Sequence, residues 1–193
     1  MTARVNPTLE PGGVYRPKDF ASLAKNPTVV LERLVEEGKL ERLGYGLYHC
    51  PREGRFGPRP PDDGALLSAF LGGRDYVLTG PTFWNALRLG TTGVASTPLV
   101  YNDVRSGALK VGRRTFRFRR VRFPRRPTRE WYAVDLLNHA PQAGAAAPDL
   151  LGPLGTALAG DALDRSAFFA ALDEYGTRTT KNLVAEKLSA LRP

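Results

Sequence analysis

Arginine side chains, which can bind phosphates and carboxylates, gather in one stretch of this sequence. Ten basic residues and no acidic residue lie between Lys110 and Arg129. The net charge of the chain is +9, so subtracting these ten leaves −1 for the rest of the sequence. Dense guanidinium groups bind phosphates or acidic proteins, although they can also be merely solvated. We therefore predict a basic C-terminal face consisting of Lys110, Arg113, Arg114, Arg117, Arg119, Arg120, Arg122, Arg125, Arg126 and Arg129.

A second set of polar residues surrounds a helix expected near the N-terminus. The N-terminal turn of this helix would offer Asn26, Thr28 and free backbone N–H groups, which suit the phosphates of a DNA duplex. Arg33 is spaced to pair with Glu37 on the same helix. The predicted DNA-binding residues are Arg16, Lys18, Lys25, Asn26, Thr28, Arg33, Lys39, Arg42 and Tyr45.

Catalytic chemistry is not indicated by the remaining polar residues. The two histidines, His49 and His139, belong to no motif with metal-ligand spacing, and neither a phosphate-binding loop nor a Gly-x-Ser-x-Gly motif is present. Gly72-Gly73 is faintly similar to the start of a nucleotidyltransferase, but the next acids, Asp75 and Asp103, lack the spacing of paired metal-binding carboxylates. We expect no enzyme activity, no catalytic residue, no metal and no cofactor.

The N-terminal elements that position the predicted DNA-binding residues form a compact series. A short helix is expected over 17–24 and a second over 28–37, where apolar residues recur at i, i+1, i+4 and i+5. Two strands, 40–43 and 47–50, flank a glycine-rich turn typical of a hairpin. Helix, turn, helix and hairpin in this order predict a winged helix-turn-helix over residues 1–52.

The rest of the chain predicts a second domain, so the fold class is α+β. Residues 53–63 are rich in Pro, Gly and Arg and are expected to be a linker, with Asp62-Asp63 capping the next helix. Residues 64–193 are expected to form a mixed α/β domain that ends in two helices. Aromatic and Arg residues alternate over 115–123, which predicts a strand with a bulge at Arg119-Arg120. The other elements expected are helices at 64–71 and 81–89 and strands at 76–79 and 99–101.

Cysteine usage and hydropathy bear on where the chain works. Cys50 is the only cysteine, so no intrachain disulfide can form. No run of apolar residues is long enough for a transmembrane helix, and the N-terminus has no apolar segment typical of a secretion signal. We expect a cytoplasmic protein without a membrane partner.

Two blocks of sequence resemble the AbiEi-type antitoxin family. The first comprises residues 16–24 and 31–48, where a helix ends in Leu-Val-Glu-Glu-Gly-Lys-Leu-Glu-Arg and a wing closes on Gly-Leu-Tyr. The second is Leu-Thr-Gly-Pro-Thr-Phe-Trp-Asn-Ala-Leu-Arg-Leu-Gly-Thr-Thr at 78–92, similar to a strand and helix of the family's second domain. The chain departs from the family in lacking a full helix before residue 16.

This resemblance implies the antitoxin of a type IV toxin–antitoxin system used in phage defence. The winged helix would bind inverted repeats in its own promoter and repress the operon. The C-terminal domain, 64–193, would counter a nucleotidyltransferase-like toxin, without a stable complex being required. An alternative is a protein-interaction module that restrains a partner enzyme through the basic C-terminal face, with no specific DNA binding.

Overall fold

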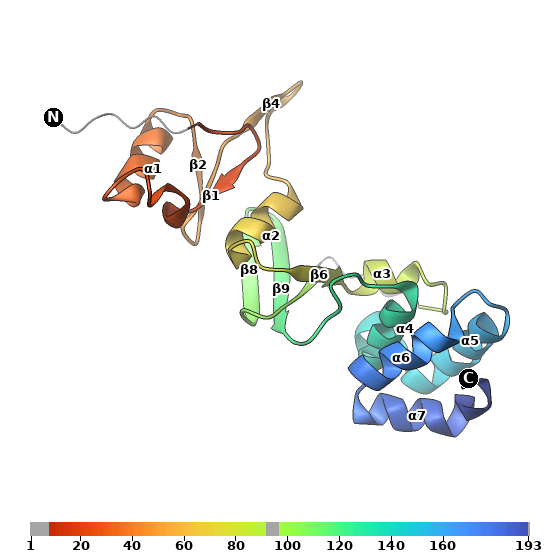
Figure 1. Cartoon of the computed structure of the whole chain (residues 1–193). Coiled ribbons are helices and arrows are strands. Elements are labelled where there is room, and N and C mark those ends of the chain that lie inside the picture. Colours follow the sequence, from red (N-terminus) through yellow and green to blue (C-terminus); the bar gives the residue numbers. More distant parts are fainter. Residues whose placement is uncertain (1–7, 92–96, 193) are drawn as a thin grey trace. The chain divides into compact units, whose positions relative to one another are not determined.

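The computed structural model of the chain describes residues 8–91 and 97–192 and is mixed α+β, with 44% helix and 19% strand. The chain divides into two compact units (Figure 1). The first unit comprises Met1–Asp75 and Val111–Arg113, and the second comprises Tyr76–Lys110 and Arg114–Pro193. No helix in the described part of the chain combines the length and apolar character needed to cross a membrane.

The first unit begins with a short strand and two helical segments. Strand β1 (Val14–Tyr15) leads into the 3₁₀ helix η1 (Pro17–Phe20), and α1 (Pro27–Glu36) follows. The helix expected over 17–24 is therefore only one 3₁₀ turn long. Helix α1 begins at proline, whose fixed φ suits a first turn, and a glycine with φ of +69° follows its end.

A three-stranded antiparallel sheet completes the core of the first unit. Strands β2 (Glu41–Gly44) and β3 (Leu47–His49) form the expected hairpin, and β1 pairs with the other side of β3. The two turn residues, Tyr45 and Gly46, have φ of +55° and +70°, as in the primed turns that match strand twist. Apolar side chains from η1, α1 and the sheet pack together at the centre: Phe20, Leu31, Leu34, Leu40 and Tyr48.

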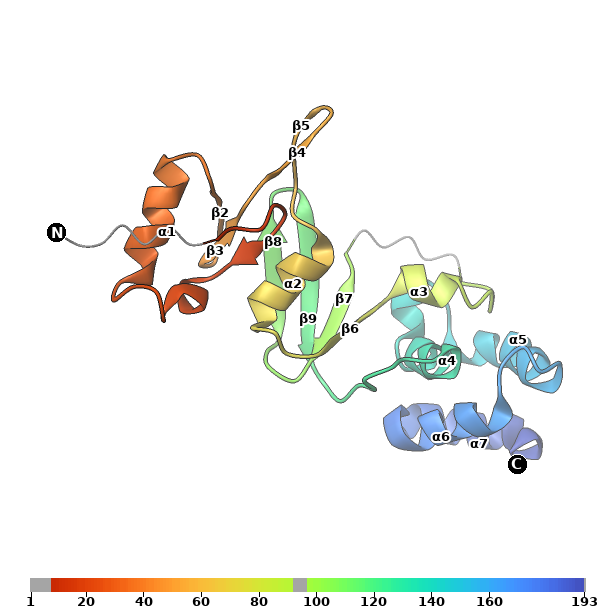
Figure 2. The ribbon, with the colours of Figure 1, turned by 45° about the horizontal axis from the view of Figure 1, so that its top comes forward.

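The stretch expected to be a linker contains a second hairpin. Strands β4 (Arg52–Gly54) and β5 (Gly57–Arg59) pair antiparallel with each other alone (Figure 2). Helix α2 (Asp63–Leu71) then begins at Asp62, whose carboxylate accepts hydrogen bonds from the N–H groups of the first turn. The helix-capping prediction is confirmed for Asp62, and the segment expected to be a linker includes most of a hairpin.

The second unit contains a four-stranded mixed sheet. Its strands are β6 (Tyr76–Thr79), β7 (Leu99–Asn102), β8 (Gly107–Val111) and β9 (Arg114–Arg120), in the order β6-β7-β9-β8. Strand β7 runs antiparallel to β6 and parallel to β9. Strand β8 was not expected from the sequence.

The pairing of β7 with β9 shows no bulge at the predicted position, Arg119-Arg120. Register between β7 and β9 runs without a shift from Leu99 opposite Arg117 to Asn102 opposite Arg120. Strand β9 ends at Arg120, so the alternation of inward and outward side chains does not extend to Val121, which is 42% exposed. Strand β9 thus ends three residues before the limit expected from the alternation over 115–123.

Helices make up the rest of the second unit. Helix α3 (Pro81–Asn85) is shorter than expected, and α4 (Arg129–Asn138) and α5 (Ala147–Ala159) were not predicted. The chain ends in two helices as expected, α6 (Arg165–Tyr175) and α7 (Arg178–Leu188). Helix α4 packs against α5, α6 and α7 and lies at the centre of their shared core. Short 3₁₀ helices follow α4 and α7: η2 (Ala140–Ala143) and η3 (Ser189–Leu191).

Candidate nucleic-acid interface

The N-terminal turn of α1 presents three exposed polar residues. Asn26 is the N-cap residue, but its side chain makes no capping hydrogen bond and is exposed, as are Lys25 and Thr28. The first turn of α1 contains no acidic residue, so the partial positive charge of the helix N-terminus is not offset there. We call Lys25, Asn26 and Thr28 the α1 turn cluster, and their chemistry suits a phosphate.

Three other predicted DNA-binding residues pair with acidic side chains. Arg33 Nε lies 3.5 Å from Glu37 Oε1, which confirms the pairing expected from their spacing. Lys39 Nζ lies 2.8 Å from the other oxygen of the same carboxylate, Glu37 Oε2. Arg42 Nη2 lies 3.5 Å from Glu32 Oε1, which also accepts a hydrogen bond of 2.7 Å from Tyr48. The charge that these three cations offer to a duplex is thus partly neutralised.

Arg16 and Lys18 lie at the C-terminal end of α2. The Lys18 ammonium is 3.5 Å from the carbonyl oxygen of Gly72, the residue that caps α2. The Arg16 guanidinium lies beside the same glycine, since a Cβ added to Gly72 would be 2.8 Å from Arg16 Nη2. Cations near helix C-termini are stabilised by the exposed carbonyl groups. These two residues therefore have a role within the fold of the first unit.

Tyr45, at the tip of the β2–β3 hairpin, contacts another part of the first unit. Its ring meets the ring of Phe70 on α2 edge to face, with centroids 6.2 Å apart. The side chain is nevertheless 64% exposed. The tip of this hairpin is thus held against α2 while its outer surface stays open.

The basic C-terminal face is mostly exposed. Eight of its ten residues are exposed and two, Arg114 and Arg119, are partly buried. Arg119 points its guanidinium Nη1 to within 2.8 Å of His139 Nε2. Arg122 reaches Glu174 on α6, with Nη2 and Oε1 3.2 Å apart. Arg119 and Arg122 therefore contact residues of the second unit itself.

Asp135, which the sequence analysis missed, is the centre of a buried polar cluster in the second unit. Its Oδ2 accepts hydrogen bonds from the Thr79 hydroxyl at 2.5 Å and from the Trp84 indole at 2.9 Å. Its Oδ1 accepts one from the Tyr101 hydroxyl at 2.8 Å. Burial and the nearby Asp135 carboxylate together raise the pKa of Tyr101 far above its usual value. The phenol therefore stays protonated and acts as a donor.

His139 links Asp135 to the basic strand β9. Because a guanidinium can only donate, Arg119 Nη1 donates to His139 Nε2, and the ring proton must be on Nδ1. That Nδ1 lies 2.9 Å from the backbone oxygen of Asp135 and 3.2 Å from its Oδ1. The ring also stacks on Trp84, with an interplanar angle of 7°. His139 is thus held in one orientation and one tautomer.

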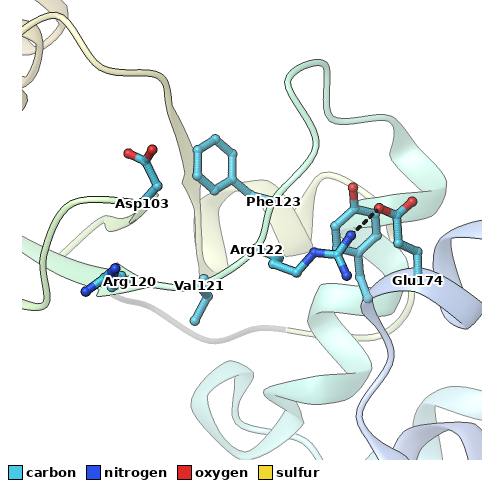
Figure 3. A pocket seen from close by; sticks show the side chains of 7 residues that line it. Asp103, Arg120, Val121, Arg122, Phe123 and Glu174 are labelled. Carbon is cyan, nitrogen blue, oxygen red and sulfur yellow. Dashed lines mark hydrogen bonds and ion pairs between the residues drawn. The ribbon is translucent and has the colours of Figure 1, made fainter.

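Two hollows lie next to this cluster. A small cavity of about 200 Å³ is lined by Tyr101, Trp131, Asp135 and His139, among others. A more open cleft of about 470 Å³ is lined by Asp103, Arg120, Val121, Arg122, Phe123, Glu174 and Tyr175 (Figure 3). The cleft contains two cations and two acidic groups, and Arg122 and Glu174 bond to each other within it. This balance of charge makes the cleft a weaker anion site than its arginines alone would suggest.

The chain matches no model of a known protein family, and it matches no curated protein. Among residues 8–91 and 97–192, no three His, Cys, Asp or Glu side chains gather as a metal site would require.

Proposed function

We propose that the chain is a DNA-binding regulator whose first unit is a winged helix-turn-helix. The observation that carries this proposal is the α1 turn cluster. It places a lysine, an amide and a hydroxyl at an uncompensated helix N-terminus, on a helix followed directly by an antiparallel hairpin. Helix-turn-helix proteins contact base edges with the N-terminal residues of such a helix.

The order of elements in the first unit is consistent with this assignment. Helical turn η1, helix α1 and hairpin β2–β3 follow each other as in a winged helix, while β1 takes the edge of the sheet. Phosphate contacts fix a protein on DNA, and base contacts give specificity. In this proposal Lys25 contacts phosphate, and Asn26 and Thr28 contact phosphate or base edges.

We further propose, from the resemblance to AbiEi-type antitoxins, that the chain autorepresses a type IV toxin–antitoxin operon in the cytoplasm. Its DNA partner would be inverted repeats in its own promoter. Its functional partner would be a nucleotidyltransferase-like toxin, countered by the second unit. Growth of cells expressing that toxin, with and without this chain, tests the antitoxin role separately from DNA binding.

The test of DNA binding is fluorescence anisotropy with the upstream DNA and a scrambled duplex. Salt should be varied from about 50 to 300 mM, because each phosphate contact adds about 0.9 to the slope of log affinity against log salt. We expect the upstream DNA to bind at least about a hundredfold more tightly than the scrambled duplex. Equal affinity for both duplexes would contradict a specific regulator.

Lys25→Ala gives the residue-level test, and Lys187→Ala is its matched control. Both substitutions remove one exposed lysine from a helix or its edge, but Lys187 lies on α7 in the second unit. We expect Lys25→Ala to weaken binding about three- to tenfold and to lower the salt slope by about one. Equal effects of the two substitutions would show that net charge alone matters.

A protein-interaction module is the second candidate function. The exposed arginines of the basic C-terminal face favour it, because guanidinium groups suit acidic protein surfaces as well as phosphates. A stable complex with the product of a neighbouring gene, together with weak and non-specific duplex binding, would support this alternative over the regulator.

A further inference from the structure

The β4–β5 hairpin is a narrow ribbon that carries an aromatic side chain at its tip. Its strands pair only with each other, and Figure 2 shows the ribbon extending away from the three-stranded sheet of the first unit. None of residues 52–59 is buried, and Phe56 is 97% exposed. A hairpin of two short strands is marginally stable by itself. Its exposed tip therefore needs an explanation other than folding.

Charge on this ribbon indicates what it contacts. The ribbon contains three arginines, Arg52, Arg55 and Arg59, and one acidic residue, Glu53, so residues 52–59 carry a net charge of +2. Arg52 and Arg59 lie directly opposite each other in register. Like charges in this position destabilise a pair of strands. A polyanion bound along the ribbon would offset that repulsion.

The tip has a geometry that suits a groove. Register ends at Gly54 opposite Gly57, which leaves only Arg55 and Phe56 in the turn, and Gly57 takes the positive φ of +101°. The Arg55 guanidinium lies 5.7 Å from the centroid of the Phe56 ring. One cation and one flat apolar ring therefore project together from a turn two residues wide.

The two hairpins of the first unit differ at their tips. Tyr45 of β2–β3 meets Phe70 within the unit, whereas Phe56 contacts only its neighbour Arg55 among the described aromatic and cation–π contacts. The tip of β2–β3 thus packs within the folded unit, whereas the tip of β4–β5 is exposed and can contact a ligand.

We propose that β4–β5 is a second DNA-contacting ribbon, in which Arg55 enters the minor groove and Phe56 wedges between base pairs. The minor groove attracts arginine, and proteins that bind there insert apolar side chains, phenylalanine among them, between base steps. The ribbon would add to the contact made by the α1 turn cluster. This inference rests on the proposed DNA-binding function.

Phe56→Ala and Phe56→Leu test the wedge in the full-length protein. Upstream duplexes carrying 2-aminopurine at single adenine positions report unstacking as a rise in fluorescence. We expect the wild type to raise the signal at one step and Phe56→Ala to abolish the rise. Phe56→Leu should restore part of it, because leucine also acts as a wedge. Circular dichroism checks that each variant is folded.

Arg55→Ala tests the minor-groove contact. We expect affinity to fall about five- to tenfold and the salt slope to fall by about one, since one cation is lost. A minor-groove drug such as distamycin should compete with the wild type and less with Arg55→Ala. Lys187→Ala is the control for a loss of charge elsewhere.

The outcomes separate this inference from the function it depends on. If Lys25→Ala weakens binding while Arg55→Ala and Phe56→Ala do not, the regulator stands and the second ribbon is overturned. If Arg55→Ala weakens binding but no 2-aminopurine position responds, the wedge is overturned. If the wild type shows no preference for the upstream duplex, the proposed function fails and this inference fails with it.

Discussion

Among residues 8–91 and 97–192, each unit buries one side chain of the histidine or carboxylate type, and the two side chains have opposite hydrogen-bonding surroundings. Asp135, in the second unit, accepts hydrogen bonds from Thr79, Trp84 and Tyr101. His49, on β3 of the first unit, is fully buried, and neither ring nitrogen has a hydrogen-bond partner among the described residues. The nearest acidic oxygen, Glu41 Oε2, lies 3.7 Å from His49 Nδ1, beyond hydrogen-bond distance.

This difference shows how hydrogen-bond partners decide whether a buried polar group is compensated. Three donors around Asp135 suit a carboxylate, so its negative charge is compensated locally. Burial without such partners disfavours the charged imidazolium of His49 and lowers its pKa, which Glu41 opposes only in part. In the second unit, three donors stabilise the buried Asp135 side chain. In the first unit, a proton added to His49 would place a buried charge without hydrogen-bond partners among the described residues.

The largest effect is expected from Asp135→Asn. The amide presents an N–H₂ group where Thr79, Trp84 or Tyr101 now donates, and the network loses an acceptor. We expect the free energy of unfolding to fall by about 3 kcal/mol. Guanidinium unfolding monitored by circular dichroism measures the loss. Asp149→Asn, at an exposed position of α5, should change stability by less than about 1 kcal/mol. Equal losses in both variants would contradict the special role of Asp135.

A smaller loss is expected from Tyr101→Phe. This change removes the hydroxyl that donates to Asp135 Oδ1 but keeps the ring that packs edge to face on Trp131. We expect a loss of about 1.5 kcal/mol, in the range for hydrogen bonds to charged groups. The double variant Asp135→Asn/Tyr101→Phe should lose less stability than the sum of the two single losses, because both changes act on one network. Full additivity in a double-mutant cycle would show that the two groups are independent.

The pH dependence of stability provides the third and smallest effect. Because folding lowers the pKa of His49, the unfolded chain binds the proton more readily. His49 therefore contributes stability that is present above about pH 6.5, the unfolded value, and is lost as pH falls toward the folded pKa. We expect the free energy of unfolding to decrease between about pH 7 and 5, with a slope below about 1.4 kcal/mol per pH unit from this group.

His49→Leu isolates the contribution of His49 from those of His139 and the acidic groups. Denaturant unfolding of the wild type and the variant should be measured at several pH values over the same range. The stability of the wild type relative to that of His49→Leu should decrease as the pH is lowered from about 7 to 5. Parallel curves would mean that His49 does not titrate differently in the folded and unfolded chain.

Elements with one apolar face could be predicted from the sequence. The stripe of α1 contains Leu31 and Leu34, which are both buried, and the glycine-rich turn correctly marked the β2–β3 hairpin. Helix α4 was missed because almost all of residues 131–137 are buried. A helix that is buried on all sides has no amphipathic period to detect. The β4–β5 hairpin was missed because its Pro and Gly residues also suit a loop.

The residue types of the candidate site could be predicted from the sequence, but the contacts that these residues make with distant parts of the chain could not. The sequence placed Lys25, Asn26 and Thr28 at the start of a helix, and the structure has them there. It could not place Arg16 and Lys18 at the end of α2, since that contact spans more than fifty positions of the chain. An acid within an apolar segment was the available signal for Asp135, because a carboxylate there needs donors from elsewhere.

Both tryptophans of the chain, Trp84 and Trp131, are buried in the second unit, and the first unit contains none. Indole emission is sensitive to solvent, so it follows the opening of the second unit alone, while far-ultraviolet dichroism follows both. Trp84 also lies stacked on His139. The molecule thus carries a built-in optical label on one of its halves, and ligand binding or melting can be assigned to a half without attaching a dye.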